Sequence, residues 1–254
     1  MKLAFREYGA GQPLIILHGL FGQSDNWNSL AKKFAEEHLH VFTIDLRNHG
    51  LSPHSEDWDY PVMAEDISQF IHDHALEKPI LLGHSMGGKV LLFFELAYPG
   101  TLSKLIVADI SARYYPPHHQ NVIRALQAVD LNLVKSRKEA EEAMSLHLSD
   151  FGTKQFLLKN LHWKENGILD WRFNLDVISR KIEYIGTAVP AYQSQTPILV
   201  LRGERSDYVS DEDLQDFTQR YVHMQSETIS GAGHWLHADK PEAFFGAVMR
   251  FIKG

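Results

Sequence analysis

The chain has 254 residues with a formal net charge of −7 at pH 7, 44% hydrophobic residues, 22% charged residues and no cysteine. This composition is typical of a folded protein, and the length suits one α/β domain or two small ones. The negative charge argues against nucleic acid or an anionic membrane as the main partner, since both need a basic face. The lack of cysteine excludes disulfides, thiolate metal sites and cysteine nucleophiles.

No stretch of the chain is typical of a targeting or membrane segment. Arg6 and Glu7 stand where a signal peptide would have an apolar run, and no apolar stretch approaches the ~20 residues of a membrane span. Histidine pairs such as His118–His119 lie in polar stretches, where we expect solvated side chains and not metal ligands. We therefore expect a soluble, cytoplasmic protein, monomeric or homodimeric, without cofactor or metal.

Strands alternate with helices along most of the chain. Short apolar or β-branched runs that end at turns predict buried strands at 14–17, 40–46, 80–82, 104–110, 197–203 and 226–231. Apolar side chains at helical spacing predict helices from Trp27 to Phe34, Met63 to Ile71, Val90 to Ala97 and Phe244 to Ile252. This alternation predicts an α/β fold in which a mostly parallel sheet has helices on both faces.

The alternation breaks between Arg113 and Ala191, in a stretch with helical segments and no convincing buried strand. At about 75 residues this stretch far exceeds the usual length of a connection. A helical insertion between sheet strands should lie above their C-terminal edge, where such sheets bind ligands. We therefore expect a helical cap at 113–191 on a core formed by 1–112 and 192–254.

Residues 83–87 read Gly-His-Ser-Met-Gly and lie between a predicted strand and a predicted helix. In that context the pattern predicts a tight turn that presents Ser85 Oγ as a nucleophile at the edge of the sheet. Gly83 and Gly87 leave room for the sharp turn. The helix N-terminus behind Ser85 offers amide donors and a partial positive charge to a developing oxyanion. A serine hydroxyl is a weak nucleophile, so a base must come from elsewhere in the fold.

A histidine and two aspartates are candidates for the rest of a catalytic triad. His234 follows the predicted last strand in a glycine-containing loop, and the order serine then histidine favours it as the base. His237, where the chain turns into the final helix, is the weaker alternative. Asp109 and Asp207 both lie just past strands at the same edge, and either could orient the histidine.

Six blocks of sequence together resemble the α/β-hydrolase fold, and more narrowly the YbfF-type esterases and their eukaryotic abhydrolase-domain relatives: LHGLFG, DLRNHGLSP, GHSMGG, VADISARYYP, WRFN and GAGHWLHADKP. The resemblance covers nearly the whole chain. It implies serine hydrolysis of ester or thioester substrates, with a helical cap over the site.

The resemblance also bears on the choice of acid. In most α/β-hydrolases the acid stands in a pattern Gly-x-x-Asp-x-x-Val, and the stretch GERSDYV places Ser206 at that position with Asp207 one residue later. The YbfF-type proteins are similar in having their acid one strand earlier, at the match to Asp109. The resemblance therefore favours Asp109, with Asp207 as the alternative.

The LHGLFG block resembles the oxyanion-hole block of the same family. There Leu20, and Met86 after the nucleophile, would donate their backbone amides to the oxyanion. The charged and polar side chains of the DLRNHG block are expected to form a structural ion pair and a loop anchor instead of taking part in chemistry: Asp45, Arg47 and His49.

The substrate is specified only weakly. Large side chains are candidates to line an apolar slot for a short to medium acyl chain, although fewer than half are expected to touch a ligand: Phe21, Met144, Trp163, Trp171, Phe173, Tyr208 and Trp235, with Arg172 nearby. No arginine cluster indicates a coenzyme A phosphate site. A serine carboxylesterase or thioesterase is the main hypothesis. The alternatives are a lyase or carbon–carbon hydrolase with the same triad, and a non-catalytic receptor of the same fold.

Overall fold

The computed structural model of the protein describes residues 1–117, 119–165 and 167–254, so His118 lies outside the described residues. The strands of its main sheet are β1 (Phe5–Tyr8), β2 (Gln12–Leu17), β3 (Leu39–Ile44), β4 (Ile80–His84), β5 (Lys104–Ala108), β8 (Ile198–Gly203) and β9 (Met224–Ile229). Their spatial order is β1-β3-β2-β4-β5-β8-β9. Only the β1–β3 pair is antiparallel among these described strands. The predicted, mostly parallel sheet is confirmed.

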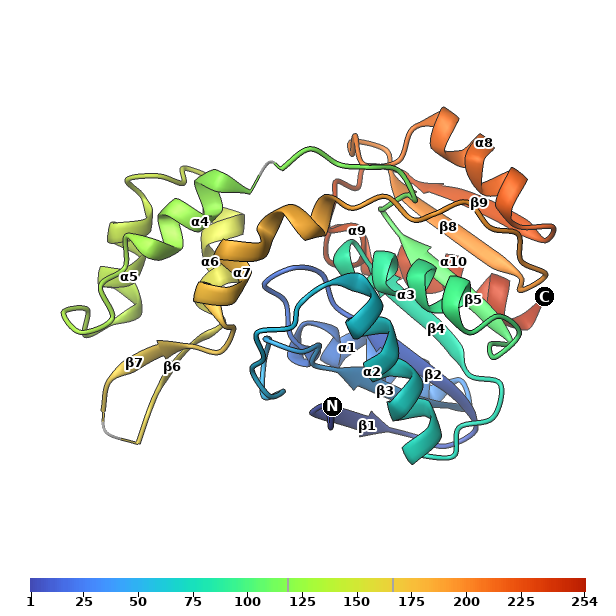
Figure 1. Ribbon diagram of the computed structural model, residues 1–254, viewed down its shortest axis with the longest axis horizontal. Coiled ribbons are helices and arrows are strands. Elements are labelled where there is room, and N and C mark those ends of the chain that lie inside the picture. Colours follow the sequence, from blue (N-terminus) through green and yellow to red (C-terminus); the bar gives the residue numbers. More distant parts are fainter. Residues whose placement is uncertain (118, 166) are drawn as a thin grey trace.

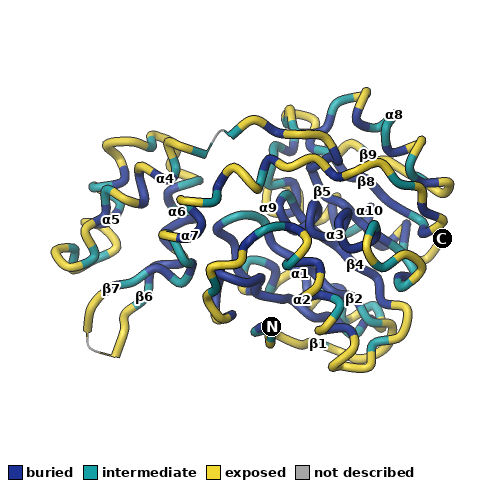
Figure 2. Tube along the Cα trace, viewed as in Figure 1, coloured by how far each residue is buried: buried dark blue, intermediate teal, exposed yellow. Residues whose placement is uncertain are grey.

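Helices cover both faces of this sheet (Figure 1). The helices of the core are η1 (Ser24–Trp27), α1 (Asn28–Glu36), α2 (Tyr60–Asp73), α3 (Met86–Ala97), α8 (Asp211–Arg220), α9 (Leu236–Asp239) and α10 (Pro241–Lys253). Alternate residues of β2 face opposite ways. Leu14 and Ile16 pack with α1 and α10, whereas Ile15 and Leu17 pack with α2 and α3. Figure 2 shows the buried strands between these layers.

The first strand, β1, is not predicted from the sequence. It lies at the edge of the sheet, and its central residues Arg6 and Glu7 are exposed. Phe5 packs against Phe42 and Phe70. An edge strand of this kind needs no apolar run, so hydrophobicity alone does not reveal it.

The stretch from Arg113 to Ala191 holds helices and one hairpin that lie to one side of the sheet (Figure 1). They are α4 (Gln120–Gln127), α5 (Arg137–Met144), α6 (Phe151–Leu158), β6 (Leu161–Trp163), β7 (Leu169–Trp171), α7 (Leu175–Lys181) and η2 (Ile182–Gly186). The expectation of an all-helical insertion is wrong, because β6 and β7 form a short antiparallel pair. Strands of three residues are too short to show alternation. The Asn-Gly dipeptide between them, typical of hairpins, is the signal that could have found them. Within the described residues, no helix combines the length and the apolar character that crossing a bilayer requires.

The two segments that enter and leave this stretch meet at Lys89 of α3. The Lys89 ammonium donates to the carbonyl oxygen of Arg113 at 2.6 Å and to that of Thr187 at 3.0 Å. The side chain is fully buried. Burial, together with the charge of Arg113, lowers the pKa of the Lys89 amine from 10.5 to about 7.

We expect the free energy of unfolding to rise between pH 7 and pH 9 because of Lys89. Its folded pKa lies below its unfolded pKa, so in this window the unfolded chain holds more protons and stability increases with pH. The gain is about 2 kcal/mol. Urea unfolding at both pH values measures this rise in the wild type and in Lys89→Met. A second variant, Lys89→Arg, keeps its charge throughout. An equal rise in all three proteins would contradict the assignment.

Candidate active site

Ser85 occupies a strained turn between β4 and α3. Its backbone has φ 51° and ψ −118°, a conformation that costs about 1–3 kcal/mol in a residue other than glycine. A Cβ atom at Gly83 would lie 2.5 Å from the backbone of Gly87, and one at Gly87 would lie 2.7 Å from the carbonyl oxygens of Leu17 and His18. Only glycines therefore permit the turn. Ser85 N–H donates to Ala108 O at 2.9 Å, which ties the turn to the next strand.

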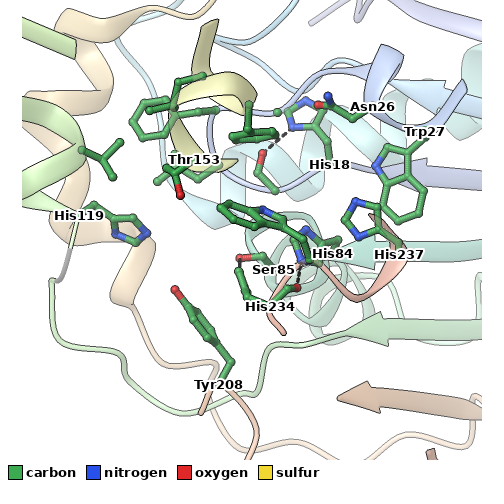
Figure 3. A pocket seen from close by; sticks show the side chains of 18 residues that line it. His18, Asn26, Trp27, His84, Ser85, His119, Thr153, Tyr208, His234 and His237 are labelled. Atoms are coloured by element: carbon green, nitrogen blue, oxygen red, sulfur yellow. Dashed lines mark hydrogen bonds between the residues drawn. The ribbon is translucent and has the colours of Figure 1, made fainter. Parts of the chain in front are cut away.

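A chain of hydrogen bonds runs from Ser85 to a buried carboxylate. Ser85 Oγ lies 3.0 Å from His234 Nε2, as Figure 3 shows, and His234 Nδ1 lies 2.8 Å from Asp109 Oδ2. Because Nδ1 faces a carboxylate it donates, which leaves Nε2 free to accept the serine proton. Asp109 directly follows β5 with φ 54° and is fully buried.

The loop after β8 holds the Asp109 carboxylate in place. Gly203 N–H donates to Oδ1 at 2.9 Å, and the Ser206 hydroxyl donates to Oδ2. Ser206 stands where the usual acid of the family would stand, so here that position supplies a hydroxyl to the acid of the neighbouring strand. Asp207 is exposed, and within the described part of the chain its hydrogen bonding is limited to its backbone oxygen, which accepts from Arg113 at 3.4 Å. The structure thus brings Asp109, and not Asp207, to His234.

Among the hydrogen bonds of the described residues, Ser85 Oγ pairs with His234 and none joins it to His237, the alternative base. Its ring is buried and stacks on Trp27 with centroids 4.2 Å apart. Burial, and to a lesser degree the charge of His234, lowers its pKa to about 3. The His84 ring packs against the rings of both His234 and His237. Its Nε2 donates to His234 O at 2.8 Å, which anchors the loop that carries His234. Sequence reasoning gave no role to His84.

Two backbone amides beside Ser85 lack an acceptor. Among the hydrogen bonds of the described residues, none involves the N–H of Leu20 or that of Met86, the first residue of α3. The next amide along, Phe21 N–H, donates instead to His49 Nε2 at 3.2 Å. Phe21 adopts φ 58°, so the turn after β2 is sharply bent at this point. Leu20 and Met86 are therefore the amides free to bind an oxyanion.

The DLRNHG block anchors this turn. Arg47 makes a bidentate ion pair with Asp66 at 2.6 and 2.8 Å, and both side chains are buried. Asp45 accepts from the N–H of Ser24 at 2.6 Å and from that of Leu51 at 2.9 Å. These contacts agree with the expected structural roles.

A cavity of about 280 Å³ opens beside Ser85 and His234 (Figure 3). Of the predicted lining residues, Phe21, Tyr208 and Trp235 border it. The structure adds side chains from α4, α6 and core loops that were not predicted to line the slot: His18, Asn26, Trp27, His84, His119, Val122, Thr153, Phe156 and Leu157. In α6 apolar residues occupy both faces, so the sequence does not show which face borders the cavity. In α4 the apolar face is clear from the sequence, but whether it meets the core or the cavity is not.

The remaining predicted lining residues lie elsewhere. Trp163 is 57% exposed on the β6–β7 hairpin. Trp171 and Phe173 stack on each other with centroids 5.4 Å apart and border a separate cavity, which does not include Ser85. Met144 is buried in the hydrophobic core. These positions correct the predicted slot: Trp171, Phe173 and Met144 are buried by packing, and Trp163 is exposed.

Comparison with known proteins agrees with this architecture. A family model described as alpha/beta hydrolase fold matches residues 12–241. The chain is 36% identical over 252 residues to the sn-1-specific diacylglycerol lipase ABHD11 of Xenopus laevis, covering 96% of this chain and 80% of that protein. It is 34% identical over 260 residues to the esterase YbfF of Escherichia coli strain K12, covering 99% of each. A solved marine microorganism esterase has 40% identity and a TM-score of 0.95, covering 98% of this chain and 99% of that one. The predicted resemblance is confirmed: the chain belongs to the α/β-hydrolase fold family.

Proposed function

We propose that the protein is a serine carboxylesterase that hydrolyses small to medium acyl esters or thioesters through an acyl-enzyme. The observation that carries this proposal is the run of hydrogen bonds from Ser85 Oγ through His234 to Asp109, with two unpaired amides beside it. The esterase and lipase names of the relatives support the hydrolase class.

In the proposed first step, Ser85 Oγ attacks the ester carbonyl carbon while His234 Nε2 takes the hydroxyl proton. Asp109 stabilises the resulting imidazolium. The N–H groups of Leu20 and Met86 stabilise the oxyanion, and a donor of this kind contributes about 3–4 kcal/mol in related enzymes. The intermediate collapses, the carbon–oxygen bond to the alcohol breaks, and His234 returns its proton to the leaving alkoxide.

In the second half, water replaces the alcohol. His234 Nε2 takes a proton from the water as its oxygen attacks the acyl-enzyme carbonyl carbon, and the second tetrahedral intermediate releases the carboxylic acid. The proton returns to Ser85 Oγ, so the enzyme is regenerated. A thioester would follow the same course with a thiolate as the leaving group.

Ser85→Ala is expected to lower kcat for p-nitrophenyl acetate by several orders of magnitude, since removal of the triad serine costs about 10⁶-fold in a serine protease of another fold. A fluorophosphonate probe should label the wild type and leave the variant unlabelled. Substantial hydrolysis by pure, folded Ser85→Ala would refute the acyl-enzyme and the function with it. Esters and thioesters that share one acyl group separate the two substrate classes.

A further inference from the structure

A second, much narrower cavity also reaches Ser85. Its volume is about 20 Å³, against about 280 Å³ for the first. The two cavities share Leu20, Ser85, His119 and Tyr208, so they are two branches that meet at the nucleophile. We call them the wide branch and the narrow branch.

The two branches differ in which part of the catalytic apparatus they contain. His234 borders the wide branch and is not among the residues of the narrow one, whereas Met86 borders the narrow branch and is not among those of the wide one. The leaving alkoxide must lie within hydrogen-bond reach of His234 Nε2 to receive its proton. The alcohol half of the ester therefore extends into the wide branch.

The acyl half of the ester must extend away from both the oxyanion amides and His234. With the carbonyl oxygen turned to the N–H groups of Leu20 and Met86, and the alcohol beside His234, the fourth substituent of the tetrahedral carbon points away from His234. The narrow branch begins at Ser85 and Met86 on that side. A volume of about 20 Å³ holds one or two water-sized groups. An acetyl or propionyl group fits this space, and a longer chain does not.

The wall of the narrow branch is held by hydrogen bonds. Ile182 and Ile185 of η2 form part of it. Tyr60 donates its hydroxyl proton to Ile185 O at 2.8 Å, and Tyr115 N–H donates to Gly186 O at 2.9 Å. Moving η2 outward to widen the branch would break these contacts, whereas truncating a side chain of η2 would leave them in place.

The wide branch offers apolar surface from the insertion and the core. Phe156 of α6 packs against Trp235 with ring centroids 5.6 Å apart, and Val122 and Leu157 border the same space. Burying each additional methylene of an alcohol against such a surface is worth about a fourfold gain in binding. The wide branch thus selects for large apolar alcohols.

We propose that this enzyme acts on esters that join a very short acyl group, acetyl or propionyl, to a bulky apolar alcohol. The proposal rests on the proposed serine esterase function and specifies which half of the ester each branch receives. It places substrate selectivity mainly in the alcohol.

Two ester series measure the selectivity. In one series p-nitrophenol is esterified with acetyl, butyryl and hexanoyl groups; in the other, acetate is esterified with ethanol, butanol and octanol. We expect kcat/KM to fall at least tenfold across the acyl series and to rise at least tenfold across the alcohol series. A flat or rising acyl series with a falling alcohol series would overturn the proposal.

Two matched variants assign the effects to the branches. Ile182→Ala should raise the hexanoyl-to-acetyl ratio of kcat/KM about tenfold and leave the slope of the alcohol series in place. Phe156→Ala should flatten the alcohol series and leave the acyl ratio in place. Ile185→Ala replaces Ile182→Ala if that variant does not melt cooperatively. If instead Ile182→Ala flattened the alcohol series and Phe156→Ala raised the hexanoyl-to-acetyl ratio, the two halves of the ester would occupy the opposite branches.

Failure of this proposal is distinguishable from failure of the esterase function. Hydrolysis that depends on Ser85 but follows the reverse selectivity overturns the assignment of the branches alone. Hydrolysis that survives Ser85→Ala overturns the esterase function itself.

Discussion

Asp109→Asn is expected to lower kcat by about 10⁴-fold, whereas Asp207→Asn should change it by about twofold or less. The carboxylate of Asp109 is the group bonded to His234 Nδ1, and an amide in its place lets the imidazole adopt the wrong tautomer, at a cost of about 10⁴ in a related triad. Asp207 is exposed, and no hydrogen bond or ion pair among the described residues joins its carboxylate to the triad. The measurement is kcat for each variant on one p-nitrophenyl ester, with thermal melts as the check on folding.

Asp207→Asn serves as the matched control, because it makes the same chemical change in the same region. A crippled Asp207→Asn with a mild Asp109→Asn would make Asp109 structural. Two mild single variants with an inactive double variant would show that the carboxylates substitute for one another. Either result would contradict the assignment of Asp109 as the sole acid.

The elements around the nucleophile could be predicted because their sequence signals are local. A buried strand, a Gly-x-Ser-x-Gly turn and a helix follow one another at 80–97. The position of His234 in the last loop followed from chain order. Position after a strand could not decide between Asp109 and Asp207, since both follow strands at the same edge, and only the resemblance to the family favoured Asp109. The choice depends on contacts across three strands, among them the bond from Ser206.

The substrate cavity was harder to predict because its walls come from segments far apart in the chain. Trp171 and Phe173 are aromatic residues of the kind that often line a ligand slot, yet they pack on each other away from Ser85. Phe156 and Val122, which border the cavity, are ordinary apolar residues of short helices. Which face of a helix meets the cavity depends on how the insertion packs on the core, and a single sequence does not record that packing.

The protein is expected to lose most of its stability between pH 8 and pH 5, because buried neutral histidines surround the active site. Burial lowers the pKa of His18 to about 4 and, with charge repulsion, that of His49 to about 3 and that of His237 to about 3. The pKa of His84 is also lowered by burial and by the neighbouring histidines. The bonds from Nδ1 to backbone carbonyls raise the pKa of His18 and of His49, but burial outweighs them, and a backbone amide that donates to Nε2 favours the neutral form of each ring.

Two of these rings cannot take up a proton without losing a bond. His18 donates from Nδ1 to Gly19 O at 2.8 Å and accepts from Leu46 N–H at Nε2, 3.0 Å away. His49 donates from Nδ1 to Arg47 O at 3.0 Å and accepts at Nε2 from a backbone amide. A proton on either Nε2 would displace the amide that it binds.

The sign and size of the effect follow from linkage. Each folded pKa lies below the unfolded value near 6.5, so the unfolded chain binds the extra protons and stability falls as the pH drops below 6.5. Going from pH 8 to pH 5 lowers the free energy of unfolding by about 2 kcal/mol for each of His18, His49 and His237, or by about 6 kcal/mol together. A typical domain has only about 5–15 kcal/mol of stability.

Urea unfolding between pH 8 and pH 5 tests this expectation, since the slope of the unfolding free energy against pH counts the protons taken up. A slope of about three protons or more is expected near pH 5.5. His237→Phe keeps the stack on Trp27, removes a ring nitrogen that has no partner, and should lower the slope by about one proton. A wild-type slope below one proton would contradict the neutral cluster. His49 holds the amide next to Leu20 only in the folded chain, so we expect activity to fall in step with the folded fraction as the pH drops.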